Sequence, residues 1–420
     1  MRPMQSIPGV VRLHGRVLHY PWGGHGFLPS WLNQPNPTGQ PWAEYWLGAH
    51  CHAPSRLSLG DQQAEPVECL DQAIKSAPEA WLGSARLYDS LPFLVKLLDV
   101  ARPLSIQLHP NAAQARAGFA HEQSAGIAID APCRNFQDPN PKPEFLLALS
   151  KFWLLYGLCP AQEIHRRLGN VPGLERLSRT LSEAGPCERV RAVFELMPEA
   201  ACECVRSLTA YAGSLPDSTR LDRGTPWPWI LDWRQMHQEH PEAQNDRGVL
   251  FFALMHIARL EPGDALMIDA GRPHAYLYGQ GLEVMTSSNN VIRAGLTTKY
   301  CNPDLFVSLL EPCEKPPKIL QSAFRRGIKS YRLNRPEFNP AVIRLNDPGR
   351  PVRLPALAGP AILVALEGEI TVTPGPALHG GQAILIRPEI PLELEASKPA
   401  MLAWIRQGND LGNSMHRAKD

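Results

Sequence analysis

Residues 262 to 277, PGDALMIDAGRPHAYL, contain a pattern that returns in a changed form near the C-terminus. The stretch opens with a Pro-Gly turn signal, continues through an apolar run, and meets a second turn before further apolar residues. Residues 380 to 395, GGQAILIRPEIPLELE, repeat this order 118 positions later, so that Gly381 corresponds to Gly263 and Pro391 to Pro273. Each copy is typical of a turn, a buried strand, a turn and a second strand. The self-similarity predicts two copies of one β-unit, although a match this short also arises by chance.

The two copies differ where the second strand is expected to begin. His274 of the first copy corresponds to Leu392 of the second. An imidazole nitrogen is a common metal ligand, whereas a leucine side chain cannot bind a metal. If the copies are related, only the first can hold a metal ion at this position.

The first copy also resembles the second signature motif of the cupin family, G-x5-P-x-G-x2-H. Gly263, Gly271 and His274 match the motif, and Asp269 replaces its proline. Cupins are double-sheet jelly rolls, and the motif histidine is a metal ligand in the mouth of the barrel. The resemblance implies that a turn delivers His274 inward from a rigid strand, as a preorganised metal site requires.

A second candidate strand, PLSIQLHP at residues 103 to 110, carries a glutamine and a histidine two positions apart. Apolar and polar residues alternate from Leu104 onward, and Pro110 ends the run. Because side chains two apart on a strand point to the same side, the pattern predicts that Gln107 and His109 share one face. That face is either the water-exposed side of a half-buried strand or a pair of metal ligands.

A carboxylate that could complete such a site lies in DPNPKPEFLLALS, residues 138 to 150. Glu144 stands between a Pro-rich loop and a strongly apolar run, where a partly buried carboxylate needs partners. The alternative is a glutamate at a strand entry that faces water. Gln107, His109, Glu144 and His274 together offer only nitrogen and oxygen donors, a set that suits zinc, with iron, manganese or cobalt possible.

Composition excludes several classes of protein. The chain has 420 residues, of which 44% are hydrophobic and 20% charged, with a net charge of +1. This length is enough for two or three domains. The balanced charge shows no excess of basic residues of the kind that binds nucleic acid or an anionic membrane. No signal peptide is expected, and the most apolar stretch, FLLALSKFWLLYGL, is too short and too interrupted by Lys151 to span a bilayer. The nine cysteines form no C-x-x-C pair, so we expect free thiols in a reducing cytoplasm.

The chain shows three sequence textures. Residues 1 to about 155 mix short apolar runs with Gly and Pro, which indicates mostly strands, with a helix expected over residues 69 to 83. From about 160 to 245, apolar side chains recur three and four positions apart, which predicts several short helices. From about residue 248 the strand pattern returns. The expected fold class is therefore mainly β with a helical domain.

The chain resembles type I mannose-6-phosphate isomerases through a series of motifs in the same order. The matching stretches are YPWGG at 20–24, AEYWLGAHCHAPS at 43–55, LPFLVKLLDVARPLSIQLHPN at 91–111, NPKPEF at 140–145 and PHAYLYGQGLEVMTSSNNVIRAGLTTKY at 273–300. The resemblance implies two cupin-like jelly-roll β-units plus an α-helical insertion. The expected domains are a catalytic cupin domain of residues 1–155 with 247–318, a helical domain of residues 156–246, and a C-terminal cupin-like domain of residues 319–420.

The resemblance also implies a chemistry. By motif position, the family's zinc ligands fall on Gln107, His109, Glu144 and His274, with one Zn²⁺ per chain. The implied reaction interconverts mannose 6-phosphate and fructose 6-phosphate by moving a proton between C1 and C2 through a cis-enediolate. A Lewis-acid metal stabilises the charge that develops on oxygen, and a base moves the proton.

Two titratable family residues are missing from these motifs. Pro141 stands where the family has a histidine, and Asn289 where it has an aspartate, and neither can transfer a proton. The remaining candidates are Lys142, Glu283, Glu44, His50 and a metal-bound water. The expected catalytic residues are Arg293, Lys142 and Glu283, and those expected to bind substrate are Trp22, Glu44, Lys96, Ser105 and Lys299. The charges of Arg293 and Lys299 suit substrate oxygens or phosphate.

The sequence leaves two function classes open and favours a third less. The complete ligand set favours a metal-dependent aldose–ketose isomerase. Pro141 and Asn289 favour a metal-binding cupin that has impaired or altered activity, binding a sugar phosphate or isomerising another sugar. An iron-dependent cupin oxygenase would leave the isomerase motifs unexplained. We expect a cytoplasmic monomer or weak homodimer that binds a small sugar phosphate and neither nucleic acid nor membranes.

Overall fold

Both copies of the repeated stretch form strands at corresponding positions in the computed structural model. The structure describes residues 7–58, 68–84, 86–244, 246–331, 333 and 335–408. In the first copy, β11 (Ala265–Ile268) is followed by β12 (His274–Thr286). In the second copy, β20 (Ala383–Ile386) is followed by β21 (Leu392–Glu395), and each begins 118 positions after its counterpart. The predicted order of turn, strand, turn and strand is confirmed in both copies.

A glycine in the left-handed region of backbone conformation precedes the first strand of each copy. Gly263 has a φ of 89° and Gly381 a φ of 90°. A residue with a Cβ adopts this conformation only with strain. At Gly381 a Cβ would also lie 2.1 Å from the Trp31 carbonyl oxygen, so the turn requires glycine there.

The chain divides into two compact units. One unit comprises residues 1–99, 282–287 and 320–420, and the other residues 100–281 and 288–319, so that β12 contributes to both. The three domains expected from the sequence group these residues differently, and their boundary between residues 155 and 156 falls inside β9 (Phe152–Leu158). The three-domain division stays a prediction.

The first unit contains two antiparallel sheets. Besides β20 and β21, their strands are β1 (Val10–His14), β4 (Arg56–Ser58), β5 (Glu68–Cys69), β14 (Ile328–Ser330), β15 (Asn339–Leu345), β16 (Val352–Leu354), β17 (Ala361–Glu367), β18 (Glu369–Thr373), β19 (Leu378–His379) and β22 (Ala400–Arg406). One sheet has the order β14-β15-β22-β17-β20-β1-β4-β5, and the other the order β16-β21-β18-β19. Ile384, Leu394 and Trp404 belong to one buried core that both sheets contribute to. The side chains that the two sheets bury between them form this core, which agrees with the strand pattern of the C-terminal sequence.

The N-terminal part of the first unit adds three paired strands and three short helices. These are β2 (Arg16–Leu18), β3 (Glu44–Leu47), β6 (Phe93–Val100), α1 (Phe27–Trp31), α2 (Leu70–Ser76) and α3 (Pro78–Leu82). β3 pairs with β2 and with β6, in both cases antiparallel. The helix expected over residues 69 to 83 is confirmed as α2 and α3, which are separate because Pro78 cannot continue α2 and instead begins α3.

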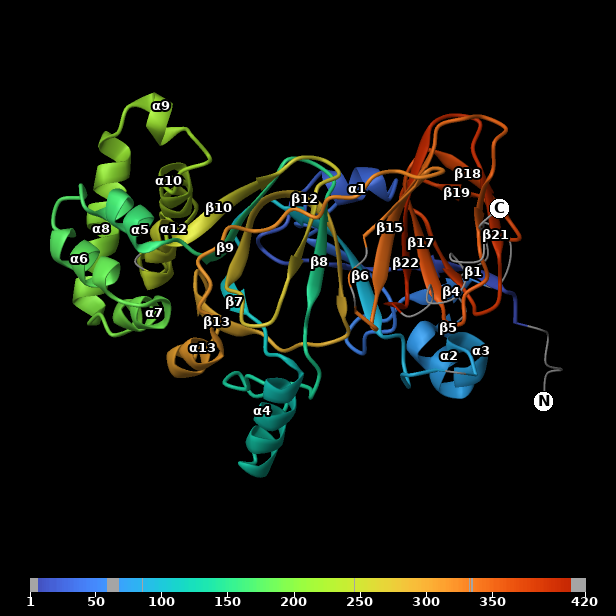
Figure 1. Cartoon of the computed structure of the whole chain (residues 1–420), viewed down its shortest axis with the longest axis horizontal. Helices are drawn as coiled ribbons and strands as arrows, with labels where there is room; N and C mark the ends of the chain where they lie inside the picture. The colour runs from blue at the N-terminus through green and yellow to red at the C-terminus, as the bar shows by residue number, and fades with distance from the viewer. Residues whose placement is uncertain are drawn as a thin grey trace. The chain divides into compact units, whose positions relative to one another are not determined.

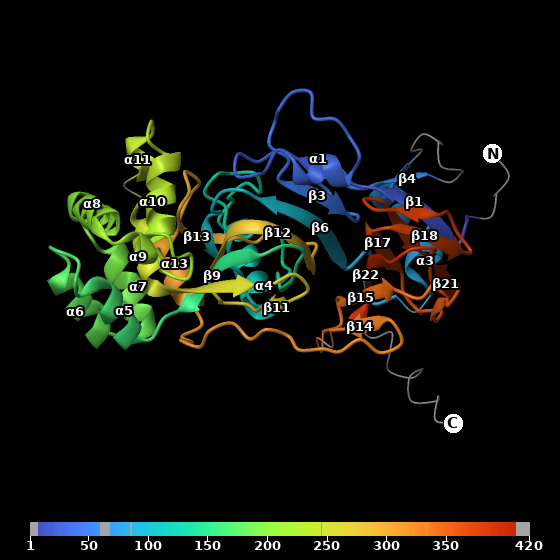
Figure 2. The ribbon, with the colours of Figure 1, turned by 90° about the horizontal axis from the view of Figure 1, so that it is seen from above.

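Short helices dominate residues 161 to 254 of the second unit, and the apolar spacing predicts them as far as about residue 245. They are α5 (Ala161–Leu168), α6 (Glu175–Glu183), α7 (Pro186–Phe194), α8 (Pro198–Ser214), α9 (Asp217–Arg220), α10 (Trp227–Met236), α11 (Pro241–Gln244), the 3-10 helix η1 (Arg247–Leu250) and α12 (Phe251–Leu254). The strand pattern expected from about residue 248 is wrong for residues 248–254, which are helical, and the first strand there begins at Met255. The Asp246 side chain accepts a hydrogen bond from the Gly248 N–H and so starts a helix in an apolar run that periodicity alone cannot assign. Figure 1 and Figure 2 both draw α5, α6, α7, α8 and α10 as one group. Ile164 of α5, Trp229 of α10 and Phe251 of α12 share one apolar core with Leu155 of β9.

The remaining elements of the second unit include the strands that carry Gln107 and Glu144. They are β7 (Ile106–Leu108), α4 (Ala112–Ser124), β8 (Glu144–Ala148), β10 (Met255–Leu260), β13 (Ile292–Gly295) and α13 (Pro303–Leu309). Antiparallel pairs join β10 to β9, β9 to β12, β12 to β7, β7 to β13, and β11 to β8. Antiparallel sheets with a helical segment confirm the predicted fold class. No helix in the described ranges is long and apolar enough to cross a membrane.

Candidate metal centre

Strand β7 carries the glutamine of the predicted Q-x-H pair, and the histidine follows directly after it. The alternation predicts a strand from Leu104, but β7 is shorter and begins at Ile106, because the Leu104 amide instead donates to the Tyr276 carbonyl oxygen at 2.8 Å. Ile106 and Leu108 are fully buried, as their spacing predicts. Gln107 is half-buried and pairs in register with His274 of β12. The strand pairing therefore brings the predicted ligands of two distant motifs together.

Three of the predicted ligands form a buried cluster. His109, Glu144 and His274 have relative exposures of 1%, 2% and 0%. His109 Nε2 lies 3.2 Å from Glu144 Oε1, and His274 Nε2 lies 3.3 Å from Glu144 Oε2. Glu144 is the first residue of β8 and is fixed there by its register with Ile268 of β11, the buried strand that precedes His274.

Backbone carbonyl groups orient both imidazole rings. His109 Nδ1 lies 2.7 Å from the Asn290 carbonyl oxygen, and His274 Nδ1 lies 3.0 Å from that of Arg272. Because a carbonyl oxygen only accepts hydrogen bonds, each Nδ1 carries the proton and donates it. In the neutral rings the lone pair therefore lies on Nε2, which is the atom that faces Glu144.

Burial and one nearby cation set the charges of this cluster. Burial lowers the pKa of His109 to about 4, and the ammonium group of Lys142 also acts to lower it. Burial alone would raise the pKa of Glu144, but the ammonium group of Lys142 holds it well below its ordinary value. Lys142 Nζ lies 3.0 Å from Glu144 Oε1. Near neutral pH the cluster therefore offers a carboxylate and a neutral His109 imidazole.

The unsatisfied atoms of this cluster fit a metal ion. Within the described part of the chain, His109 Nε2, His274 Nε2 and Glu144 Oε2 are buried and form no hydrogen bond. Buried polar atoms without partners are costly, so three of them around one point indicate a missing partner. Two imidazole nitrogens and a carboxylate oxygen within 4.8 Å of one another suit zinc. The Gln107 amide stays a predicted fourth ligand.

The other predicted site residues of the second unit lie on or beside the same strands. Arg293 of β13 pairs in register with Gln107, and burial lowers the pKa of its half-buried guanidinium. Ser105 directly precedes β7, and Lys299 is exposed beyond β13. The structure thus places Arg293 next to a predicted ligand, while the roles of Ser105 and Lys299 stay predictions.

The first unit holds a second group of predicted site residues. Lys96 Nζ lies 3.1 Å from Glu283 Oε2 and 3.6 Å from Glu44 Oε2. The Trp46 indole donates to Glu44 Oε2, and Lys96 Nζ lies 4.8 Å from the centre of the Trp46 ring. The register of β3 and β6, which opposes Trp46 to Lys96, explains this arrangement. These side chains are all buried, so the group is a compact charged cluster within an apolar setting.

Trp22 and His50 lie on loops of the same unit. The Trp22 ring stacks on Tyr20 with centroids 5.8 Å apart, and the buried His50 ring meets Trp46 edge-on at 4.9 Å. Burial and the Glu44 carboxylate raise the pKa of Tyr20. The substrate role expected of Trp22 and the acid–base role considered for His50 stay predictions.

Sequence reasoning overlooked two residues of these clusters. Trp46 lies two positions after Glu44 on one strand, and this spacing alone predicts that both point to the same face. Asn290 accepts the His109 hydrogen bond from a position 181 residues away. No local pattern could have revealed that second contact.

The chain is similar in sequence to proteins of known function. Residues 10–160 match the family described as phosphomannose isomerase type I, catalytic domain. The chain is 33% identical over 368 residues to mannose-6-phosphate isomerase of Escherichia coli (strain K12), covering 87% of this chain and 90% of that protein. It is 30% identical to mannose-6-phosphate isomerase 1 of Arabidopsis thaliana, covering 93% and 92%.

A solved structure is similar over nearly the whole chain. It is mannose 6-phosphate isomerase from Salmonella typhimurium, described as bound to its substrate fructose 6-phosphate and zinc. The two structures superpose with a TM-score of 0.83 at 30% sequence identity, covering 95% of this chain and 100% of that one. The similarity therefore includes both units of this chain.

Proposed function

Because the chain belongs to the type I mannose-6-phosphate isomerase family, we propose that it interconverts mannose 6-phosphate and fructose 6-phosphate with one bound zinc ion. The buried cluster of His109, Glu144 and His274 is the observation that carries this proposal. A catalytic metal site needs ligands that are already oriented and deprotonated, and the imidazole orientation and the low pKa of Glu144 support both requirements.

The proposed division of labour separates metal binding from proton transfer. Gln107, His109, Glu144 and His274 hold the zinc ion, which when bound supplies Lewis acidity for the negative charge that develops on substrate oxygen. Isomerisation also requires that a proton leave C2 of mannose 6-phosphate and arrive at C1, through a cis-enediolate. Water must be kept from this intermediate, and the burial of the cluster serves that purpose.

We assign the proton transfer to Lys142. A general acid or base must lie within reach of the reacting carbon atoms, which a metal site holds close to its ligands. Lys142 Nζ lies 3.0 Å from Glu144, and this position beside the ligand cluster supports the assignment. Glu283 is the alternative, since it is a buried carboxylate whose partner is Lys96.

The charged residues suit the anionic substrate. Arg293 presents a planar guanidinium that can donate two hydrogen bonds to substrate or phosphate oxygens, and Lys299 adds an exposed ammonium group. We assign a catalytic role to Arg293 as well as to Lys142. We assign substrate binding to Trp22, Glu44, Lys96, Ser105 and Lys299. The pairing of Arg293 with Gln107 supports its place near the metal ligands.

A second candidate function is a metal-binding cupin with impaired or altered isomerase activity. It is favoured by Pro141 and Asn289, which replace the titratable residues of the family motifs. Both functions predict zinc binding, but only the first predicts efficient turnover of mannose 6-phosphate.

A coupled assay separates these two functions. Protein stripped of metal with a chelator is assayed for conversion of mannose 6-phosphate to fructose 6-phosphate before and after one equivalent of zinc is added. We expect activity only after zinc is restored. Full zinc binding without turnover would instead support the second candidate.

We also propose that the protein acts in the cytoplasm as a monomer or weak homodimer, with no nucleic-acid or membrane partner. Its nine cysteines are all free, and its net charge is +1. Free thiols are typical of reducing compartments, and a balanced charge gives little attraction to polyanions. Light scattering over a range of concentrations tests the oligomeric state.

A further inference from the structure

The loop between α4 and β8 delivers two of the proposed active-site residues, Lys142 and Glu144, although it contains no helix or strand of its own. It spans residues 125–143, whose backbone forms only turns, bends and irregular segments. A loop of this length needs fixed contacts if the side chains at its end are to hold a precise geometry. The residue that supplies most of these contacts at the end nearest β8 is Asn290.

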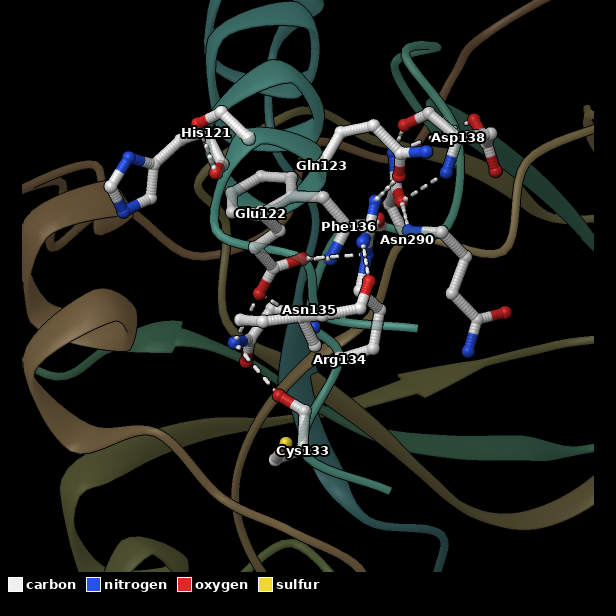
Figure 3. Close-up of polar contacts among 12 residues, drawn as sticks. His121, Glu122, Gln123, Cys133, Arg134, Asn135, Phe136, Asp138 and Asn290 are labelled. Atoms are coloured by element: carbon white, nitrogen blue, oxygen red, sulfur yellow. Dashed lines mark hydrogen bonds and ion pairs between the residues drawn. The ribbon is translucent and has the colours of Figure 1, made fainter. Parts of the chain in front are cut away.

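Asn290 is fully buried and uses both ends of its side-chain amide. Its Oδ1 accepts hydrogen bonds from the backbone N–H groups of Gln137 at 2.8 Å and Asp138 at 3.3 Å. Its Nδ2 donates to the carbonyl oxygens of Asp138 at 2.7 Å and Asn140 at 2.8 Å. Figure 3 shows Asn290 beside Asp138, with dashed lines to the loop. The side chain therefore holds four backbone groups of residues 137–140.

The backbone of the same residue contacts a proposed metal ligand. The Asn290 carbonyl oxygen accepts the Nδ1 hydrogen of His109 at 2.7 Å. One residue thus fixes the orientation of His109 and also the loop that leads to Lys142 and Glu144. A shift of its backbone would turn His109, and a loss of its amide would release the loop.

A separate group of contacts holds the earlier part of the loop. Glu122 of α4 accepts hydrogen bonds from the backbone N–H groups of Asn135 at 3.0 Å and Phe136 at 2.8 Å. It also forms an ion pair with Arg134, at 3.0 Å from Nε. Figure 3 shows this group and Asn290 along the same loop. Loss of the Asn290 amide would therefore loosen residues 137–140 while the Glu122 contacts keep the rest of the loop attached.

We propose that Asn290 is a positioning residue that couples the orientation of His109 to the placement of Lys142 and Glu144. The inference rests on the proposed function for its metal site, but it concerns metal affinity rather than turnover. The amide is the chemical requirement, because the site needs one acceptor and one donor within a single planar group. An aspartate has the same shape, but it has no donor and would face two carbonyl oxygens with a negative charge.

The test measures zinc affinity in metal-free protein by competition with a chromophoric chelator. We compare the wild-type protein with Asn290→Asp and Asn290→Ala. Changing a residue that orients a metal ligand typically weakens metal binding by about 10- to 100-fold, and we expect a loss in this range for both variants. Replacing zinc by cobalt gives a second readout, because the visible absorption of bound cobalt reports ligand geometry, and we expect it to change.

Asn140→Ala is the matched control. It removes an exposed amide from the same loop and keeps the Asn140 carbonyl oxygen that Asn290 contacts. We expect its zinc affinity and cobalt spectrum to match those of the wild-type protein. Circular dichroism establishes that each variant is folded.

Each outcome decides the inference. Wild-type zinc affinity and an unchanged cobalt spectrum in folded Asn290→Asp would overturn it. If neither Asn290 variant folds, the residue supports the fold as a whole, and the inference is equally overturned. If the wild-type protein binds zinc but has no isomerase activity, the proposed function fails, while the effect of Asn290 on zinc affinity still stands or falls by itself.

Discussion

The two copies of the repeated β-unit share a backbone and differ in chemistry. Both begin with a glycine in the left-handed region, at Gly263 and Gly381, and both continue through strands of corresponding position. The second strand of the first copy begins with His274, whereas that of the second begins with the buried Leu392. The turn glycines and the buried strands therefore determine the backbone of this β-unit. Its ability to bind a metal depends on a residue that differs between the copies, His274 in the first and Leu392 in the second.

The difference extends to the neighbouring strands. In the first copy, Ile268 of β11 pairs with Glu144, the carboxylate of the candidate metal site. The corresponding residue of the second copy, Ile386 of β20, pairs with Val10 and with Ala361. The candidate metal site takes Glu144 from β8 and His274 from β12, so the second copy differs in its strand partners as well as in one histidine. Substitutions that alter one copy and spare the other therefore test the comparison.

The largest effect should come from removing the histidines of the first copy's site. We expect His109→Ala combined with His274→Ala to reduce bound zinc from about one ion per chain to about none, because only a carboxylate and an amide remain. Elemental analysis after dialysis measures the stoichiometry. His240→Ala, which changes an exposed histidine, is the control and should keep its zinc. Full occupancy in the double variant would rule this site out, and Gln107→Ala alone should weaken binding less.

Removing the proposed proton carrier should be the next largest effect. Lys142→Met keeps a chain of similar length but removes the ammonium group beside Glu144. We expect turnover to fall by at least about 100-fold, the usual contribution of an acid–base group, while zinc stays bound. Steady-state kinetics and metal analysis on the same samples separate the two effects. Lys151→Met, at an exposed lysine, is the control, and near-wild-type turnover in Lys142→Met would leave Glu283 or a metal-bound water as the candidates.

A moderate gain is expected from restoring the two missing family residues. Pro141→His combined with Asn289→Asp should raise turnover about tenfold, which corresponds to about 1.4 kcal/mol of barrier, if their loss impairs proton transfer. The Asn289 backbone N–H, which donates to Asp138 at 2.8 Å, is retained in this variant. Asn140→Asp adds one negative charge at an exposed position of the same loop and serves as the control. Unchanged turnover would show that the two substitutions are no defect.

The strands and the clustering of three candidate ligands could be predicted because they leave local signals. Gly263 and Gly381 mark turns, alternation marks β7, and the family motifs contain His109, Glu144 and His274. The predicted start of β7 at Leu104 was wrong, because the Leu104 amide bonds to Tyr276 outside the strand pairing and the strand begins at Ile106.

The supports of the site could not be predicted from local sequence. Asn290 bonds to His109 across 181 residues and to Asp138 across 152, and neither contact leaves a periodic pattern. The ion pairs of Lys96 with Glu44 and Glu283 similarly depend on strand register. Such contacts exist only once the sheets have formed. The sequence could therefore predict which residue types suit metal binding, but not the contacts that hold those residues in place.

The smallest effect on metal and activity should come from giving the second copy its missing histidine. Leu392→His places an imidazole where the first copy has His274. Leu392 pairs with the apolar Leu354. Ile386, which corresponds to the partner of Glu144 in the first copy, pairs with Val10 and Ala361, so no carboxylate takes the place of Glu144 there. We expect zinc to stay at about one ion per chain and isomerase activity to be unchanged.

The cost of this change should appear in stability instead. Leu392 is 3% exposed and lies in the core of the first unit, so an imidazole there would be a buried polar group without partners. Such a group costs about 1–3 kcal/mol, and urea unfolding should show a loss of this size. Glu395→His, at the exposed end of the same strand, is the control and should change neither quantity. A second zinc ion per chain in Leu392→His would contradict the comparison, because it would mean that one histidine at the start of the second strand is enough to make this β-unit bind metal.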